Sequence, residues 1–316
     1  MTFSSQLRRS LTSTLIHLGP ENAIVFALVG LRCRKFGVEI RKHASYWSIS
    51  REGREMRIAP KHFVYAPTLA ERFNDYFDSL SPSEIGGKLV LDYSRPGNLQ
   101  TYAKSGLQFE MASFPEEDSA IGGYFRWYRP QPGDLVFDIG AHCGVSTYEF
   151  SRLVGPGGRV IALEPDPVNF SLLLRNIQRH QLENVTPVHA ALASQRGEAA
   201  FSCEEALGSR LVRHANRSSI GNVVMVETIT LEDAFRRWGA AQFCKIDIEG
   251  SEVEVLSQAQ DFLESERPSC QFTIDTNHLL DGSLTDGRVE ALFRASGYEA
   301  ESSEVFGFLT TWARPA

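Results

Sequence analysis

The 316-residue sequence has few cysteines, no long hydrophobic segment and no excess of positive charge. Its five cysteines show no paired or zinc-type spacing, which argues against a disulfide framework and predicts a reducing compartment, the cytoplasm. The most apolar run, residues 23–31, is too short for a transmembrane helix, which needs about 20 residues. The start lacks the pattern of a secretory signal. The net charge of −7 argues against a nucleic-acid partner.

Positive charge is nevertheless concentrated in residues 1–45, which carry seven arginines and lysines against two glutamates. We expect one or two helices here, broken at Gly19-Pro20. A basic amphipathic helix would give peripheral membrane contact through residues 1–45. The interpretation that we favour is a helix packed on a neighbouring domain, with its basic face in solvent.

The most informative stretch is residues 134–144, D-L-V-F-D-I-G-A-H-C-G. The apolar run 135–139 predicts a strand that is buried on both faces, and Gly140 and Gly144 mark a tight turn into a helix that begins at Val145. A strand, a glycine turn and a helix form the first unit of a nucleotide-binding α/β domain. The turn allows the backbone to approach a ligand at the carboxyl edge of the sheet.

Further strands follow the same plan. Residues 159–163 predict a second buried strand that ends on Glu164, about 20 residues after the glycine turn, where dinucleotide-binding folds place an acid against ribose hydroxyls. Asp166 and Pro167 have the residue types of an N-cap and a first helical position. The other predicted strands are 185–191, 198–203, 222–228, 243–248, 269–274, 298–302 and 306–312. The alternation predicts a doubly wound α/β sheet with its ligand at the carboxyl edge.

Two pairs of residues have the spacing of capping boxes: Thr230 with Asp233, and Ser251 with Glu254. We therefore expect a helix to begin at each pair. Asp247 and Glu249 then lie between a strand end and a helix N-terminus, where the peptide dipoles favour negative charge.

Two cofactor classes fit a glycine turn of this kind. The pyrophosphate of a dinucleotide is commonly held by G-x-G-x-x-G, but His142 stands at the second glycine position. S-adenosylmethionine has no phosphate and carries a cationic sulfonium and amino group, so it favours acids such as Asp138 near the turn and Glu164 at the ribose. The sequence therefore favours S-adenosylmethionine over NAD.

Several segments resemble the FkbM family of S-adenosylmethionine-dependent methyltransferases: residues 138–144, residues 164–167, Asn176 and residues 245–252, K-I-D-I-E-G-S-E. The resemblance covers about residues 120–300. It implies a seven-stranded Rossmann-like methyltransferase sheet with the last strand inserted antiparallel, and mostly O-methylation of natural products and sugars. His142 departs from the family, which usually has asparagine there. We expect an N-terminal α+β appendage over residues 1–112 and a methyltransferase domain over residues 113–316.

The resemblance and the charges of the two substrates together imply three sets of site residues. The cofactor-binding set is Asp138, Gly140, Ala141, His142, Gly144, Glu164, Asp166, Ala191 and Leu192. The catalytic set, which would include a base for a hydroxyl acceptor, is Asp247, Glu249, Lys245 and His278. Asp247, Asp275 and Asn277 offer oxygen ligands to Mg²⁺, as in catechol-type O-methyltransferases, although the FkbM resemblance does not require a metal.

We therefore expect an S-adenosylmethionine-dependent methyltransferase that O-methylates a hydroxyl of a sugar, glycolipid or polyketide-type natural product. The acceptor is a small molecule or a glycan. Three alternatives stay open: an N-methyltransferase, a non-catalytic cofactor-binding protein and an NAD-linked oxidoreductase. The first third of the chain has no constellation to which chemistry can be assigned. We expect it to serve substrate binding or dimerisation, and thus a homo-oligomer.

Overall fold

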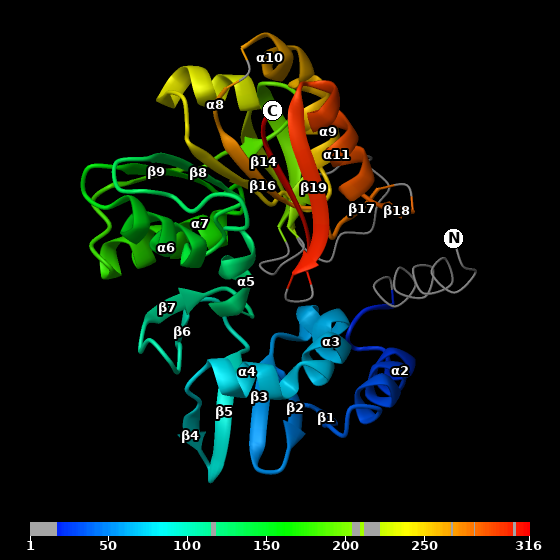
Figure 1. Ribbon diagram of the computed structural model, residues 1–316. Coiled ribbons are helices and arrows are strands. Elements are labelled where there is room, and N and C mark those ends of the chain that lie inside the picture. The colour runs from blue at the N-terminus through cyan, green and yellow to red at the C-terminus, as the bar shows by residue number, and fades with distance from the viewer. Residues whose placement is uncertain are drawn as a thin grey trace. The chain divides into compact units, whose positions relative to one another are not determined.

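The structure is a computed structural model that describes residues 18–114, 118–203, 209–211, 222–266, 268–280, 282–305 and 308–316. Residues 1–17 of the basic N-terminal segment lie outside the described residues. The chain divides into two compact units, which Figure 1 shows with their elements labelled. Described residues 18–114 belong to the first unit, and those of 118–203, 209–211 and 223–316 belong to the second.

The first unit combines a five-stranded sheet with short helices, which confirms the predicted α+β character of the appendage. The sheet order is β1-β2-β3-β5-β4. Its strands are β1 (Glu39–Lys42), β2 (Trp47–Arg51), β3 (Arg54–Ile58), β4 (Ser83–Ile85) and β5 (Lys88–Tyr93). The remaining elements are α2 (Ala23–Arg34), η1 (Pro60–Tyr65), α3 (Ala66–Glu71), α4 (Phe73–Ser79) and the hairpin β6 (Asn98–Thr101) with β7 (Gln108–Met111).

The predicted break at Gly19-Pro20 is confirmed. Gly19 has a φ of +74°, and α2 begins only at Ala23. Asn22 caps α2, because its side-chain oxygen accepts hydrogen bonds from the N–H groups of Ile24 and Val25. In the described parts of the chain, no helix has both the length and the apolar character that crossing a membrane requires.

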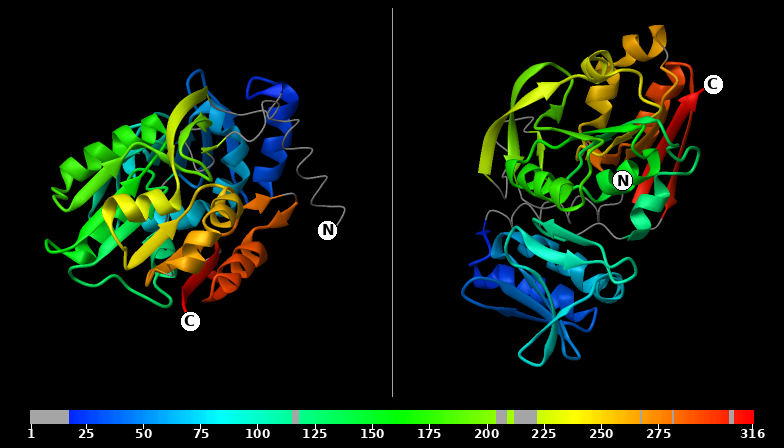
Figure 2. Two further views of the ribbon diagram at one scale, coloured as in Figure 1. Left: turned by 90° about the horizontal axis from the view of Figure 1, so that it is seen from above. Right: turned by 90° about the vertical axis from the view of Figure 1, so that its left-hand side faces the viewer.

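The second unit is built on a seven-stranded sheet with the order β10-β9-β8-β15-β16-β20-β19 (Figures 1 and 2). Its strands are β8 (Leu135–Ile139), β9 (Arg159–Leu163), β10 (Val185–Val188), β15 (Phe243–Ile246), β16 (Gln271–Asp275), β19 (Tyr298–Val305) and β20 (Phe308–Pro315). The first five are parallel, whereas β20 pairs antiparallel with both β16 and β19. The predicted doubly wound α/β sheet with an inserted antiparallel last strand is confirmed.

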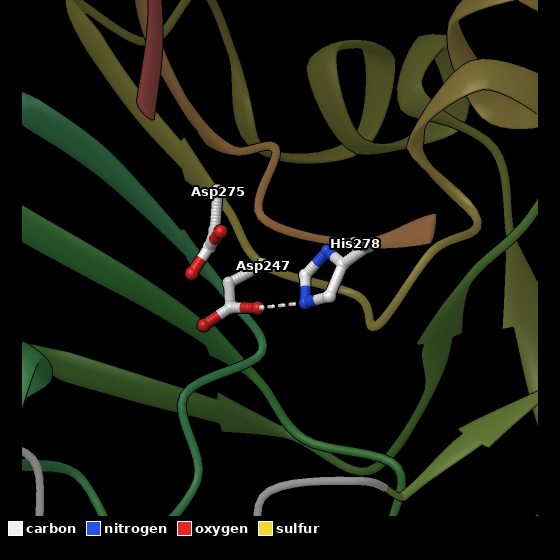
Figure 3. Close-up of side chains that lie close together, drawn as sticks. All are labelled: Asp247, Asp275 and His278. Carbon is white, nitrogen blue, oxygen red and sulfur yellow. Dashed lines mark ion pairs between the residues drawn. The ribbon is translucent and has the colours of Figure 1, made fainter. Parts of the chain in front are cut away.

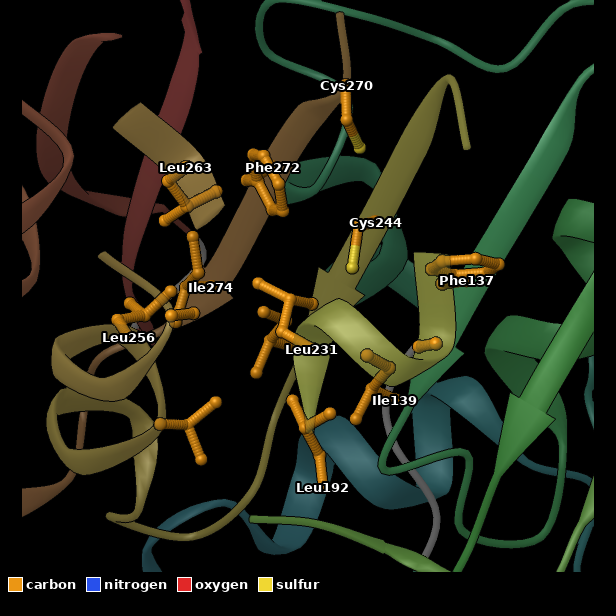
Figure 4. Close-up of a cluster of buried hydrophobic side chains, with 14 of the residues drawn as sticks. Phe137, Ile139, Leu192, Leu231, Cys244, Leu256, Leu263, Cys270, Phe272 and Ile274 are labelled. Atoms are coloured by element: carbon orange, nitrogen blue, oxygen red, sulfur yellow. The ribbon is translucent and has the colours of Figure 1, made fainter. Parts of the chain in front are cut away.

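Helices cover both faces of this sheet. They are α6 (Val145–Val154), α7 (Pro167–Arg179), α8 (Leu231–Trp238), α9 (Glu252–Gln258), α10 (Gln260–Ser265) and α11 (Asp286–Ala295), with α5 (Asp118–Gly123) before the first strand. Phe137 and Ile139 pack with side chains of α8 to α11 in the largest cluster of the unit, part of which Figure 4 shows. Ala162, which faces the opposite side, packs against Leu173 of α7. The sheet is therefore buried on both faces, as its apolar strands predicted.

The third predicted strand ends earlier than expected. It was predicted over residues 185–191, but β10 stops at Val188, because the N–H of Ala190 donates back to the carbonyl oxygen of Val188. Ala191 and Leu192 form β11 of a separate sheet with the order β11-β14-β12-β13. Its other strands are β12 (Gly197–Cys203), β13 (Arg210–Leu211) and β14 (Asn222–Ile229). The two strands predicted between residues 196 and 228 are thus confirmed, and they belong to this smaller sheet.

One predicted capping box is confirmed and the other is wrong. Thr230 and Asp233 exchange both capping hydrogen bonds at the start of α8. Ser251 makes no capping hydrogen bond, since it has the helical conformation of φ −92° and ψ 0° rather than the extended one that an N-cap needs. Glu252, the first residue of α9, instead accepts hydrogen bonds from the N–H groups of Ile248 and Gly250, in the turn before the helix.

Candidate active site

The glycine turn after β8 lies against the end of β15. Gly140 has a φ of +79°, and a Cβ atom there would lie 1.9 Å from the backbone oxygen of Asp247. The N–H groups of Gly140 and Ala141 both donate to the carbonyl oxygen of Leu163, over 3.0 and 2.9 Å. The turn therefore requires glycine for its conformation and for this close approach, and it uses its own amide groups to join the ends of β8 and β9.

Glu164, at the end of β9, is buried and connects the glycine turn to α7. Its two carboxylate oxygens accept hydrogen bonds from the backbone N–H of His142, over 2.8 Å, and of Asp166, over 2.9 Å. Burial raises the pKa of Glu164 to about 8, although the two N–H groups oppose this shift. The side chain of Asn169 also forms a hydrogen bond with this carboxylate. A carboxylate offers about four lone-pair positions, so about one remains available for a ribose hydroxyl.

Asp166 is the N-cap of α7, as predicted. Its Oδ1 atom accepts hydrogen bonds from the N–H groups of Val168 and Asn169. Its Oδ2 atom accepts one from the hydroxyl of Ser209, over 2.9 Å, in the segment that follows β12. Three polar residues that follow Ser209 in the sequence lie outside the described residues: Arg213, His214 and Arg217. The contact of Asp166 with a cofactor stays a prediction.

The other predicted cofactor residues differ in exposure. His142 is half-buried with a φ of +50°, and burial lowers the pKa of its ring to about 4, so the imidazole is neutral at pH 7. Gly144, with a φ of +92°, begins α6. Ala191 is buried, and Leu192 lies among core side chains near Ile139 (Figure 4). Contacts between these residues and an adenine ring stay predictions.

A buried ion pair lies beneath the glycine turn. Lys245 and Asp138 are both buried, and Nζ of Lys245 is 3.6 Å from Oδ1 of Asp138. The same Nζ atom donates a 2.7 Å hydrogen bond to the carbonyl oxygen of Gly140. Oδ2 of Asp138 accepts hydrogen bonds from Ser146 and Thr147 of α6, over 2.9 and 2.6 Å. Lys245 therefore bonds directly to the glycine turn, and Asp138 connects Lys245 to the start of α6.

The four predicted catalytic residues come together where β15 and β16 end. Nζ of Lys245 is 3.8 Å from Oδ2 of Asp247. Nε2 of His278 is 3.8 Å from Oδ1 of Asp247 and 3.4 Å from Oε2 of Glu249. One carboxylate oxygen each of Asp247 and Asp275 and one ring nitrogen of His278 lie within 4.8 Å of one another. Figure 3 shows these three side chains. We call these five residues the acid cluster.

Crowding of negative charge perturbs this cluster. Burial raises the pKa of Asp275 to about 7, and the charge of Asp247 adds to that shift. Burial also raises the pKa of Glu249, against the opposing effect of His278. Burial alone would lower the pKa of His278, but its pairing with Glu249 and Glu252 outweighs burial and raises the pKa well above the ordinary value. A positively charged group among these carboxylates is therefore stabilised.

Of the three predicted magnesium ligands, Asp247 and Asp275 lie together. Asn277 is exposed, and its backbone N–H donates to Oδ1 of Asp275 over 2.8 Å. The side chain that lies with the two acids, at a spacing that a metal ion could fit, is His278, which the sequence did not suggest as a ligand.

Two residues that shape the site belong to the segments that resemble the FkbM family but were not among the predicted site residues. Glu252 is fully buried, and its Oε1 atom lies 2.9 Å from Nδ1 of His278. Asn176, on α7, is buried and donates from Nδ2 to the carbonyl oxygen of Cys143 in the glycine turn, over 2.8 Å. A polar residue on the apolar face of a helix was the available signal for Asn176. Glu252 gave no such signal, because helices commonly carry acids in their first turn.

The doubly wound sheet, the glycine turn after its first strand and the acid after its second define a Rossmann-like protein with its ligand site at the carboxyl edge. The sequence model of the methyltransferase FkbM domain matches residues 138–300, more than half of the chain. The chain therefore belongs to the FkbM methyltransferase family.

Three individual relatives share between 16% and 28% sequence identity with the chain. The chain is similar to the 31-O-demethyl-FK506 methyltransferase FkbM of Streptomyces tacrolimicus, with 28% identity over 208 residues, 56% of this chain and 77% of that protein. The solved methyltransferase FkbM of Methylobacillus flagellatus KT is 16% identical with a TM-score of 0.43, over 80% of this chain and 54% of that one. The precorrin-6y C5,15-methyltransferase of Geobacter metallireducens GS-15 is 16% identical with a TM-score of 0.44, over 66% and 93%.

Proposed function

We propose that this protein is an S-adenosylmethionine-dependent methyltransferase that methylates a hydroxyl oxygen of a small-molecule or glycan acceptor. The acceptor class is a sugar, a glycolipid or a polyketide-type natural product. One observation carries the proposal: the glycine turn and the acid cluster adjoin at one edge of the sheet, where the backbone of Gly140 lies against that of Asp247. When bound, the cofactor would supply an electrophilic methyl group on a cationic sulfonium.

The hydrogen bonds of the turn support this cofactor over a dinucleotide. The N–H groups of Gly140, Ala141, His142 and Gly144 all donate to acceptors inside the protein. A pyrophosphate is held by backbone N–H groups that point at it, and these four are engaged elsewhere. S-adenosylmethionine needs no phosphate cradle, and Glu164 keeps an acceptor position for a ribose hydroxyl.

The acid cluster fits the acceptor side of the reaction. Well-oriented reactants gain about 7–11 kcal/mol from positioning, so a methyl transfer depends first on how the acceptor oxygen is held. As that oxygen gains the methyl group, its proton must pass to a base. The side chains of Asp247 and Glu249 are 19% and 29% exposed, so both are accessible to an acceptor. Lys245, which is almost fully buried, orients Asp247 from below.

A two-part experiment tests the proposal. Isothermal titration calorimetry with S-adenosylhomocysteine and with NADH measures which cofactor class binds. We expect only the first to bind, with affinity lost in Glu164→Ala. Tight binding of NADH alone would favour the oxidoreductase instead.

Transfer of a labelled methyl group is then measured on a panel of hydroxyl acceptors and matched amines. The panel includes 31-O-demethyl-FK506, which the name of the Streptomyces relative suggests. We expect hydroxyl acceptors to be methylated and Asp247→Ala to be inactive. Transfer to amines alone would support the N-methyltransferase. Cofactor binding without transfer to any acceptor would support a non-catalytic protein.

Magnesium at Asp247, Asp275 and Asn277 is a separate prediction, which the proposed transfer does not require. Methyl transfer that is unchanged by a chelator would show that the reaction needs no metal ion.

A homo-oligomer, peripheral membrane contact through residues 1–45 and a cytoplasmic location also stay proposals. Light scattering of the purified chain tests the first, sedimentation with anionic vesicles tests the second, and cell fractionation tests the third.

A further inference from the structure

Glu252 is a fully buried carboxylate on α9 that takes no direct part in the proposed methyl transfer. Two backbone N–H groups donate to its Oε1 atom, that of Gly250 over 3.0 Å and that of Ile248 over 3.3 Å, and Nδ1 of His278 lies 2.9 Å from the same atom. The last distance is that of an ion pair. A buried carboxylate is retained only where such partners offset its loss of hydration.

The partners of Glu252 come from two segments that are far apart in the chain. Ile248 and Gly250 belong to the turn that follows β15, whereas His278 follows β16. Between the two backbone partners lies Glu249, whose φ of +56° is a left-handed conformation that is unfavourable for a residue with a side chain. Glu252 therefore holds a strained turn in place and fixes one nitrogen of the His278 ring at the same time.

The geometry also determines where the other ring nitrogen lies. With Nδ1 at Glu252, Nε2 is placed 3.8 Å from Oδ1 of Asp247 and 3.4 Å from Oε2 of Glu249. His278 is the neighbour that these carboxylates share. A change in its orientation would therefore move the groups that face the acceptor.

We propose that Glu252 is a positioning residue for the acceptor side of the site, because it fixes both the His278 ring and the turn that carries Glu249. This inference rests on the proposed methyl transfer. A displacement of about 1 Å in such a site can lower a rate by about 100-fold. We expect Glu252→Ala to lower kcat by about this factor and Glu252→Gln, which keeps the acceptor oxygen, to lower it less.

Glu254→Gln is the matched control. Glu254 is an acid in the first turn of the same helix, so its loss has a similar effect on the helix dipole. Its Oε1 atom accepts a 2.7 Å hydrogen bond from Ser194 rather than contacting His278. We expect Glu254→Gln to leave kcat and the affinity for S-adenosylhomocysteine unchanged.

A measurement without an acceptor separates this inference from the proposed function. The ring of His278 is followed by NMR on histidine-labelled protein, with its signal assigned by His278→Gln. The charged groups that face it are Glu252 from α9, Asp247 and Glu249 from the turn after β15, and Asp275 from β16. Replacement of the carboxylate in Glu252→Gln should shift the Nδ1 signal of His278, because that atom lies 2.9 Å from Oε1 of Glu252, whereas Glu254→Gln should leave the signal unchanged.

The outcomes distinguish the two proposals. An unchanged Nδ1 signal of His278 in Glu252→Gln, or an unchanged kcat in both Glu252 variants, overturns the positioning role. A fall in kcat that is matched by an equal loss of S-adenosylhomocysteine affinity also overturns it, since a general structural defect would do the same. Wild-type protein that transfers no methyl group overturns the proposed function, and the NMR result then decides alone whether Glu252 orients His278. If Glu252→Ala does not fold, Glu252→Gln carries the test.

Discussion

Substitution of Gly140 by alanine tests whether a change in the glycine turn displaces the acid cluster. Gly140 requires a φ of +79°, and an added Cβ would lie 1.9 Å from the backbone oxygen of Asp247. A carbon and a nonbonded heavy atom normally approach to about 3.5 Å. The end of β15 would therefore have to move by more than 1 Å, and it would carry Asp247 with it.

Two other glycines separate the contributions to this effect. Gly133 has a φ of +96° but nothing within 4 Å of an added Cβ, so Gly133→Ala should show the conformational term alone, about 1–2 kcal/mol. Gly157 has neither a left-handed conformation nor a near neighbour, so Gly157→Ala should be neutral or stabilising by about 0.4–1 kcal/mol. Gly140→Ala adds overpacking of about 1–3 kcal/mol, which gives a total destabilisation of about 2–5 kcal/mol.

Denaturant unfolding of the three variants measures the free energies, and calorimetry with S-adenosylhomocysteine measures the site. We expect Gly140→Ala to be the least stable and to lose methyl transfer, while Gly133→Ala keeps the wild-type affinity. A Gly140→Ala protein as stable as Gly133→Ala, with unchanged affinity and turnover, would refute the idea that the glycine turn fixes the position of Asp247.

Three further predictions concern other parts of the second unit. The affinity for S-adenosylhomocysteine should rise about tenfold from pH 7 to pH 9, because Glu164, with a pKa of about 8, must be ionised to accept a charge-assisted hydrogen bond from the ribose; calorimetry should show this rise in the parent and a flat profile in Glu164→Gln. Lys245→Met should lower the free energy of unfolding by about 3–5 kcal/mol, since it leaves the buried Asp138 without its cation; an effect below 1 kcal/mol in denaturant unfolding contradicts this. Thr230→Ala should lower it by about 1 kcal/mol through loss of the N-cap, and Thr186→Ala, on an edge strand, serves as the comparison.

Much of the second unit could be predicted from the sequence because its signals are local. An apolar run of five residues, a glycine turn or an N-cap such as Asp166 depends on neighbours within a few positions. The wrong predictions came from the same local rules where a tertiary contact prevailed. Ser251 has the right residue type and spacing for a cap, yet Glu252 bonds to the turn before it and to His278, 26 positions further along the chain. The side chain of Glu252 has to be buried before this becomes its best arrangement.

The ion pair between Lys245 and Asp138 shows that the sequence contains information on strand pairing that local rules do not use. Asp138 and Lys245 interrupt the apolar pattern of two predicted strands, the first of which was expected to be buried on both faces. A charge in such a strand must be paired, and only an opposite charge on a neighbouring strand at the same level can pair with it. The observed register places Lys245 directly beside Asp138, so the charges that weaken each strand's apolar pattern also specify which strands adjoin and in what register. The same pairing puts Nζ of Lys245 under Gly140 and beside Asp247, and the register of the sheet therefore also positions the site.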